Sequence, residues 1–294
     1  MKRILNFGSL NIDYVYRLDH VVRPSETIHS EELSVFCGGK GLNQSIALKR
    51  AGAAVFHAGC TGAADGRILL DELSKTGVNT DNVRIVNERS GNAIIQVDKN
   101  GENAIIVFGG ANQCVTEEHV EQALGEFNCD DILLLQNEIN LVGFLIQAAS
   151  EKGMAIALNP SPFDRLVHNY PLHLVDIFIL NEIEGRDLAG SCEASEDGIV
   201  SALRSMFPKA KIVLTLGERG VVYFDGFNVC RHQAYKAHAV DTTAAGDTFT
   251  GYFLAGLSNG ETFPKAIEVA SKAASITVTR AGASASIPFI YEIK

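Results

Sequence analysis

The chain of 294 residues lacks tryptophan and has only three methionines, seven prolines and six cysteines. The cysteines are widely scattered, and no two of them form a CxxC pair, so neither a zinc site nor a disulfide framework is indicated. Scattered free thiols are typical of a reducing compartment, and we therefore expect a cytoplasmic protein. The sequence also lacks low-complexity tracts, so nothing indicates disorder.

Long apolar runs and an excess of basic charge are missing as well. No segment has the length of apolar residues that is needed to cross a bilayer, and the run after Lys2 and Arg3 is too short for a signal peptide. The formal net charge is -10, and an acidic chain repels a phosphate backbone, so we expect no nucleic-acid partner. An anionic ligand would have to be held by helix dipoles and a few placed cations.

The sequence does contain short apolar runs that alternate with longer amphipathic segments. This alternation predicts an α/β fold with a mainly parallel sheet covered by helices on both faces. The predicted strands are 4–7, 55–58, 132–135, 155–158, 177–180 and 212–216, and the predicted helices are 41–51, 66–76, 116–126, 140–151, 195–206, 247–258 and 264–279.

Two regions, 14–36 and 92–108, break the alternation. Both are rich in β-branched residues, and Asn100 followed by Gly101 is a strong signal for a hairpin turn in the second region. Both regions therefore predict antiparallel strands. Together they could form a small sheet that projects from the main domain as a lid.

The segment 241–247, which reads DTTAAGD, is rich in small residues and runs directly into a predicted helix. Its backbone can approach a ligand closely, and the free N–H groups at a helix start suit a phosphate or a developing negative charge. Asp247 falls in the first turn of this helix. Its carboxylate could cap the helix, or it could accept a proton from a hydroxyl group that attacks phosphorus, and the spacing alone leaves both open.

A second glycine-rich segment, 38–44, reads GGKGLNQ and opens the first long helix. It matches neither the GxxxxGK[ST] pattern nor GxGxxG, but it could wrap a polyhydroxylated ligand or a phosphate; the alternative is a plain turn. Asn11 and Asp13 follow the first predicted strand. Polar loops also follow the later strands, at 136–138, 181–184 and 217–220, and the carboxyl ends of parallel strands share one edge of a sheet. We therefore expect these polar residues to line a single rim.

The order of these motifs resembles that of the ribokinase-like (PfkB) carbohydrate kinase family, over nearly the whole chain. The resemblance implies a single domain over 1–294, with a three-layer α/β/α arrangement and a β-sheet lid formed by about 14–36 and 92–108. It implies an ATP-dependent carbohydrate kinase that transfers the γ-phosphoryl group of ATP to the hydroxymethyl group of a free sugar, with ribose as the first candidate. It also implies a homodimer that forms through the lid.

The resemblance further implies a set of site residues, which we list by role. The sugar would be bound by Asn11, Asp13, Gly39, Lys40, Asn43, Glu138 and Asp247. Asp247 would take the proton, and Ala244, Ala245 and Gly246 would form the anion hole for the transferred group. ATP would contact Asn181, Thr215, Gly217, Glu218, Gly220, Gly246 and Ser271. Glu184 would organise Mg²⁺ through water, and K⁺ would be held, mainly through backbone carbonyls, by Asp241, Thr243, Thr277, Arg280, Gly282 and Ser286.

The sequence departs from the family pattern at Ser271, where a histidine or asparagine is usual near the adenine. Arg89, at the edge of the lid, could contact the phosphate of a phosphorylated sugar or could be a solvated side chain. Within the family the alternatives are a phosphosugar kinase, a nucleoside kinase and a non-catalytic sugar-sensing homologue. A dinucleotide-binding oxidoreductase is disfavoured because the first strand leads into Gly8-Ser9-Leu10-Asn11 and not into GxGxxG.

Overall fold

Short apolar strands form the centre of a nine-stranded sheet, whose order is β13-β12-β11-β10-β9-β8-β1-β4-β5. The structure, a computed structural model, describes residues 2–190 and 195–293, so Cys192 lies outside the described residues. The parallel strands are β1 (Arg3–Phe7), β4 (Ala54–Gly62), β5 (Asn79–Val86), β8 (Ile132–Gln136), β9 (Ala155–Asn159), β10 (Ile177–Asn181) and β11 (Lys211–Thr215). Strands β12 (Val221–Phe224) and β13 (Val229–His232) extend one edge in antiparallel pairing.

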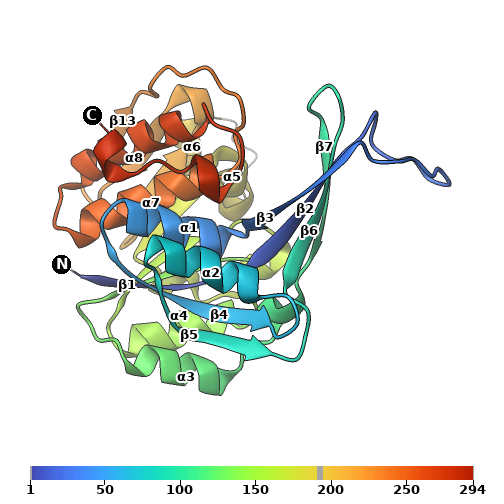
Figure 1. The fold of residues 1–294 in the computed structure, drawn as a ribbon. Helices are drawn as coiled ribbons and strands as arrows, with labels where there is room; N and C mark the ends of the chain where they lie inside the picture. The colour runs from blue at the N-terminus through green and yellow to red at the C-terminus, as the bar shows by residue number, and fades with distance from the viewer. Residues whose placement is uncertain (1, 191–194, 294) are drawn as a thin grey trace.

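Helices cover both faces of this sheet, which gives the three predicted layers (Figure 1). One face carries α1 (Lys40–Arg50), α2 (Arg67–Thr76), α7 (Ala245–Ser258) and α8 (Phe263–Thr277), and the other carries α3 (Glu117–Gly125), α4 (Val142–Glu151), α5 (Glu182–Ala189) and α6 (Glu196–Met206). Successive residues of β1 alternate between the two cores: Ile4 packs with the first helix set, and Leu5 and Phe7 pack with the second. Burial on both faces explains why the parallel strands are continuous apolar runs.

Helices α1 and α7 pack unusually closely, and this contact positions the site. A Cβ atom built on Gly251 of α7 would lie 2.4 Å from the Cβ of Ala47 on α1. Only glycine leaves room for this approach. The contact brings the amino-terminal turn of α1 next to the amino-terminal turn of α7, although the two helices lie about two hundred residues apart in the chain.

The two irregular regions form a separate four-stranded sheet that projects from the main body (Figure 1). Its strands are β2 (Asn11–Arg17), β3 (Glu32–Gly38), β6 (Gly91–Val97) and β7 (Asn103–Phe108). The predicted hairpins are present, since β2 pairs with β3 and β6 with β7 in antiparallel register, and the second turn holds Gly101 at a φ of 84°. The two hairpins join through β2 and β6, which pair in parallel, a pairing that the sequence did not predict.

Four elements of the structure were not predicted from the sequence: β5, α5, β12 and β13. Strand β5 begins with four polar residues, 79–82, and so lacks an apolar run. Helix α5 follows β10 without a break, so its polar first turn was assigned to a loop. Over the described ranges, 2–190 and 195–293, no helix combines the length and the apolar character that crossing a membrane requires.

Candidate active site

Polar residues end the central strands at one edge of the nine-stranded sheet, as predicted. Gln136 at the end of β8 pairs in register with Asn159 at the end of β9. Asn181 at the end of β10 pairs likewise with Thr215 at the end of β11. Parallel pairing thus gathers side chains from the ends of four strands along one rim, which is where ligands bind in open α/β sheets.

Asp247 lies at this rim as the third residue of α7, with only 6% of its surface exposed. Its Oδ2 accepts a hydrogen bond from Asn43 Nδ2 at 3.0 Å, and its Oδ1 accepts one from Gln44 Nε2 at 2.9 Å. The residue at the N-cap position is Ala244, not Asp247. The carboxylate therefore does not cap its own helix but faces the amino-terminal turn of α1. The alternative that Asp247 is only a cap is wrong.

The start of α7 offers free backbone donors beside this carboxylate. Ala244 adopts left-handed backbone with a φ of 60°, which turns the chain sharply into the helix. Within the described chain the N–H groups of Gly246 and Asp247 have no hydrogen-bond partner, and the space in front of Gly246 is open. Unpaired N–H groups at the positive end of a fourteen-residue helix suit an anion.

Glu138 fastens the glycine-rich loop to the end of β8. Its Oε2 accepts a hydrogen bond from the backbone N–H of Lys40 at 2.8 Å and another from the hydroxyl of Ser9. Burial raises the pKa of Glu138, although these two hydrogen bonds and the charge of Lys40 oppose the effect. Burial would lower the pKa of Lys40, but the carboxylates of Asp247, Glu138 and Glu184 outweigh it, so this pKa is raised. The loop therefore presents a fixed cation among carboxylates.

Asn11 and Asp13 begin the lid strand β2, and glycines make room for both. A Cβ atom on Gly38 would lie 2.0 Å from Asp13 Oδ2, and one on Gly91 would lie 2.2 Å from Asn11 Oδ1. Asn112 Nδ2 donates a hydrogen bond to Asn11 Oδ1 at 2.7 Å. Burial, with a smaller contribution from Glu138, raises the pKa of Asp13 to about 7. Sequence reasoning assigned no role to Asn112, because one asparagine after a glycine pair carries no distinctive signal.

The residues predicted to bind nucleotide lie along the continuation of the same rim. Asn181 and Glu184 form a capping box at the start of α5: Asn181 Oδ1 accepts the N–H of Glu184 at 2.9 Å, and Glu184 Oε2 accepts the N–H of Asn181 at 3.0 Å. Their spacing therefore has a structural role whatever else they bind. Gly217 and Gly220 take φ angles of 60° and 90° on either side of Glu218, and a Cβ on Gly220 would lie 2.1 Å from the carbonyl oxygen of His232.

Ser271 lies on α8, and its buried Oγ has no hydrogen-bond partner among the described residues. A buried hydroxyl without a partner is costly, so a ligand atom or a water that pairs with it would be favoured. The Arg89 side chain is exposed, and no ion pair to it occurs in the described part of the chain. Its contact with a phosphorylated sugar stays a prediction.

The predicted K⁺ loop is closed by Asp241. Its carboxylate accepts the N–H of Thr243 and the N–H of Gly282, both at 2.9 Å, which ties the segment before α7 to the segment after α8. The Thr277 hydroxyl donates to Thr248 Oγ1 at 3.0 Å, and Arg280 pairs with the carboxylate of Glu292 at 2.6 Å. Ser286 Oγ donates to the carbonyl of Ala283 at 2.7 Å. The side chains of Asp241, Thr277, Arg280 and Ser286 thus each have a hydrogen-bond partner within the protein.

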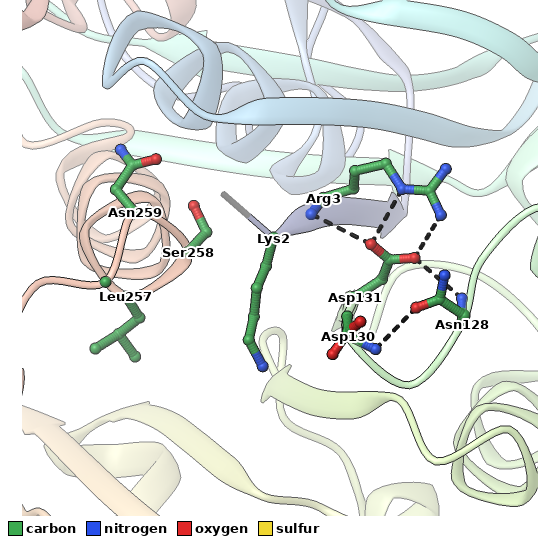
Figure 2. A pocket seen from close by; sticks show the side chains of 9 residues that line it. Lys2, Arg3, Asn128, Asp130, Asp131, Leu257, Ser258 and Asn259 are labelled. Carbon is green, nitrogen blue, oxygen red and sulfur yellow. Dashed lines mark hydrogen bonds and ion pairs between the residues drawn. The ribbon is translucent and has the colours of Figure 1, made fainter.

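A separate shallow depression of about 540 Å³ lies at the opposite end of β1. Figure 2 shows the ion pair that dominates it, in which Arg3 binds the carboxylate of Asp131 at 2.6 Å. Lys2 and Ser258 also line it. None of the predicted site residues contributes to this depression, so the rim at Asp247 and not this hollow holds the predicted chemistry.

Comparisons with known proteins agree with the geometry of the rim. Residues 1–290 match the pfkB family carbohydrate kinase profile. The chain is 34% identical to the ribokinase of Haemophilus influenzae, covering 98% of this chain and 95% of that protein, and 36% identical to the ribokinase of Schizosaccharomyces pombe, covering 100% and 97%. The crystal structure of ribokinase from Cryptococcus neoformans in complex with ADP superposes with a TM-score of 0.87 at 34% identity, covering 100% of this chain and 99% of that one.

Proposed function

The chain belongs to the pfkB family of carbohydrate kinases and is an ATP-dependent sugar kinase, and from that premise we propose that it transfers the γ-phosphoryl group of ATP to the hydroxymethyl group of free ribose. Relatives that are named ribokinase support this sugar, among them a structure from Arabidopsis thaliana complexed with ribose and ATP, which is 27% identical with a TM-score of 0.88 over 99% of this chain and 97% of that one. The observation that carries the proposal is the buried Asp247 carboxylate beside unpaired backbone donors.

Asp247 acts as the general base in this proposal. Its two oxygens each accept one amide hydrogen bond, which orients the carboxylate and leaves further lone pairs for the proton of the sugar hydroxyl. Asn43 Oδ1 is buried without a partner among the described residues and is free to accept a second sugar hydroxyl. A base placed in this way contributes about 10²- to 10⁴-fold to the rate.

The sugar would lie between the base of the lid and the glycine-rich loop. Asn11 and Asp13 supply acceptors from β2, while Lys40 and Glu138 supply a cation and a carboxylate from the other side. Gly39, with a φ of 90°, turns the chain so that the loop can wrap the ligand. Alternating donors and acceptors of this kind suit the hydroxyls of a free sugar.

The backbone at 244–246 would stabilise the transferred phosphoryl group. Phosphoryl transfer needs positioning and neutralisation of charge spread over three oxygens, and free N–H groups at a helix start supply both without extra cations. The ATP chain would run from there along the rim, past Asn181 and Thr215 to the turn at 217–220, with the base near Ser271. An acidic protein can hold this anion because the donors are local.

Magnesium fits this site as a partner of the nucleotide. In the part of the chain that the structure describes, no three His, Cys, Asp or Glu side chains cluster as a metal cage. Mg²⁺ is commonly held by one or two carboxylates, substrate phosphates and waters, and Glu184 Oε1 remains available for a metal-bound water because Oε2 serves the capping box. When bound, the ion would neutralise phosphate charge.

A monovalent cation fits the loop that Asp241 closes, since Asp241 brings Thr243 and Gly282 together. The site would be built from backbone carbonyls at Thr277, Arg280 and neighbouring positions, and K⁺ accepts such oxygen ligands. Its charge would lie next to the start of α7. Comparing kcat with and without K⁺ measures how much the cation contributes to the rate.

We also propose a cytoplasmic homodimer that forms through the lid. The lid exposes apolar side chains along its outer strands, which are Leu33, Val35, Phe36, Ile105, Ile106, Val107 and Phe108. Exposed apolar patches of this kind mark contact surfaces, and pairing two lids would cover them. Sedimentation at micromolar concentration measures the subunit number.

The test is a coupled ADP-release assay of the purified protein with free sugars, phosphosugars and nucleosides. We expect ribose to give the highest kcat/KM, and Asp247→Asn to lose about 10²- to 10⁴-fold in kcat while it still binds sugar. Turnover of a phosphosugar above ribose would instead indicate the role of Arg89 in a phosphosugar kinase. An Asp247→Asn enzyme with wild-type turnover would refute the base assignment.

A further inference from the structure

A chain of buried amide side chains runs behind Asp247, and the mechanism above does not use it. Gln44 donates through Nε2 to Asp247 Oδ1 at 2.9 Å and to Asn159 Oδ1 at 3.0 Å. Gln136 donates through Nε2 to Gln44 Oε1 at 2.7 Å and to Asn6 Oδ1 at 2.9 Å. Asn6, Gln44 and Gln136 are at most 1% exposed.

The ends of this chain fix the direction of every amide in it. Asn6 Nδ2 donates at 2.8 Å to the backbone carbonyl of Gly41, and a carbonyl can only accept. The Asn6 amide therefore cannot flip, and its Oδ1 must face Gln136. Because Oδ1 can only accept, Gln136 must present its NH₂ group to it. At the other end Asn159 Nδ2 donates at 2.9 Å to the carbonyl of Ile179, which turns Asn159 Oδ1 toward Gln44.

Every side-chain N–H of Asn6, Gln136 and Gln44 is used once. Each NH₂ group has two hydrogens, and Asn6, Gln136 and Gln44 each donate two hydrogen bonds. A flipped Gln136 would set its oxygen against two other acceptors, and a flipped Gln44 would set its oxygen against the Asp247 carboxylate. The backbone carbonyls at 41 and 179 thus dictate that a donor, and not an acceptor, reaches Asp247.

We propose that Gln44, Gln136 and Asn6 form a polarised amide relay that positions the catalytic carboxylate of Asp247. The proposal rests on the proposed function, since it takes Asp247 as the base. Gln44 and Gln136 are positioning residues: Gln44 sets the rotation of the carboxylate about its Cβ–Cγ bond, and Gln136 acts only through Gln44. Asn43, on the other oxygen, has no hydrogen-bond partner for its Oδ1 among the described residues and so stays adjustable toward the sugar.

The decisive test is a double-mutant cycle of Gln44→Met and Gln136→Met, variants that keep side-chain length and remove the amide. Gln44→Met loses one hydrogen bond to a charged group, so we expect kcat to fall about 10- to 100-fold.

Gln136→Met contacts neither Asp247 nor the sugar site, yet we expect it to lower kcat about 3- to 10-fold because Gln44 is then free to turn. In the Gln44→Met background the same change should leave kcat unaltered. A purely structural effect would instead add in both backgrounds. Asn82→Leu, a change of another buried amide far from the rim, is the matched control and should alter thermal stability but not kcat.

Sugar affinity by calorimetry separates positioning from misfolding. If both variants bind the sugar like wild type, unfold cooperatively and lose kcat non-additively, the relay is supported. Additive losses, or a Gln44→Met enzyme with wild-type kcat, would overturn it. Asp247→Asn, measured beside them, tells the two proposals apart, because its failure to lose activity would overturn the base assignment and not the relay alone.

Discussion

The pH dependence of sugar binding should report on Asp13. Its pKa is raised to about 7 by burial and by the nearby Glu138, so it is about 10% ionised at pH 6 and about 90% ionised at pH 8. A sugar hydroxyl donates to a carboxylate more strongly than to a neutral carboxyl group. If only the ionised form binds, the apparent Kd falls about tenfold between pH 6 and pH 8, in proportion to the competent fraction.

The perturbation is Asp13→Asn, which removes the titrating group and keeps the side-chain size. Calorimetry is the suitable assay because the chain has no tryptophan to report binding by fluorescence. We expect weak binding that is nearly independent of pH in this variant. His57 will not contribute, because burial lowers its pKa to about 4 and it stays neutral over this range. Asp71→Asn, which breaks an exposed ion pair with Arg67, should keep the wild-type slope.

The titration of Asp13 should also affect the stability of the ligand-free protein. The folded-state pKa of Asp13 lies above its unfolded value, so the folded state binds the proton more tightly. Its contribution to stability is therefore complete below the unfolded pKa of 3.8 and is lost as the pH rises through about 7, with a ceiling of about 4 kcal/mol. Wild type should lose more unfolding free energy between pH 5 and pH 7 than Asp13→Asn. If wild type and Asp13→Asn showed the same pH dependence, both of sugar affinity and of unfolding free energy, the reasoning would be refuted.

Two further predictions follow from the packing around the rim. Gly251→Ala should lower the unfolding free energy by about 1–3 kcal/mol in urea titrations, because the added methyl group meets α1, whereas Gly125→Ala, with open space around it, should not destabilise. Arg219 binds the carboxylates of Glu182 and Glu196 and so holds the turn at 217–220; Arg219→Gln should raise the KM for ATP about 3- to 10-fold at unchanged ribose KM. A KM change for ribose alone would contradict the second prediction.

The sequence was sufficient for the central layers because burial on both faces leaves unbroken apolar runs such as Leu133–Leu135. It was insufficient wherever a partner lies far along the chain. The contact between Asn43 and Asp247 spans 204 residues, and the parallel pairing of β2 with β6 depends on a register that no local pattern encodes.

The motifs predicted the residues of the candidate site in outline, but not the hydrogen bonds that connect them. Gln44 stood in the glycine-rich motif without a role, since nothing local shows that it meets Asp247 and Asn159. The capping box at Asn181 and Glu184 was a recognisable helix start, yet the sequence was interpreted only as giving these residues roles toward ATP and Mg²⁺. The same residue spacing can serve a helix cap and a ligand site, and the sequence alone does not distinguish the two roles.

Two of the residues proposed to bind the sugar, Asn11 and Asp13, belong to the lid strand β2 itself. Asn11, the first residue of β2, pairs with Gly38 on one side and with Gly91 on the other, so the three lid strands meet at the site itself. The seven residues of β2 extend about 20 Å from that point. If Asn11 and Asp13 bind the sugar as proposed, a small rotation of these two residues would displace the far end of β2 by a larger distance, and a contact made at that far end would in turn act on the sugar hydroxyls.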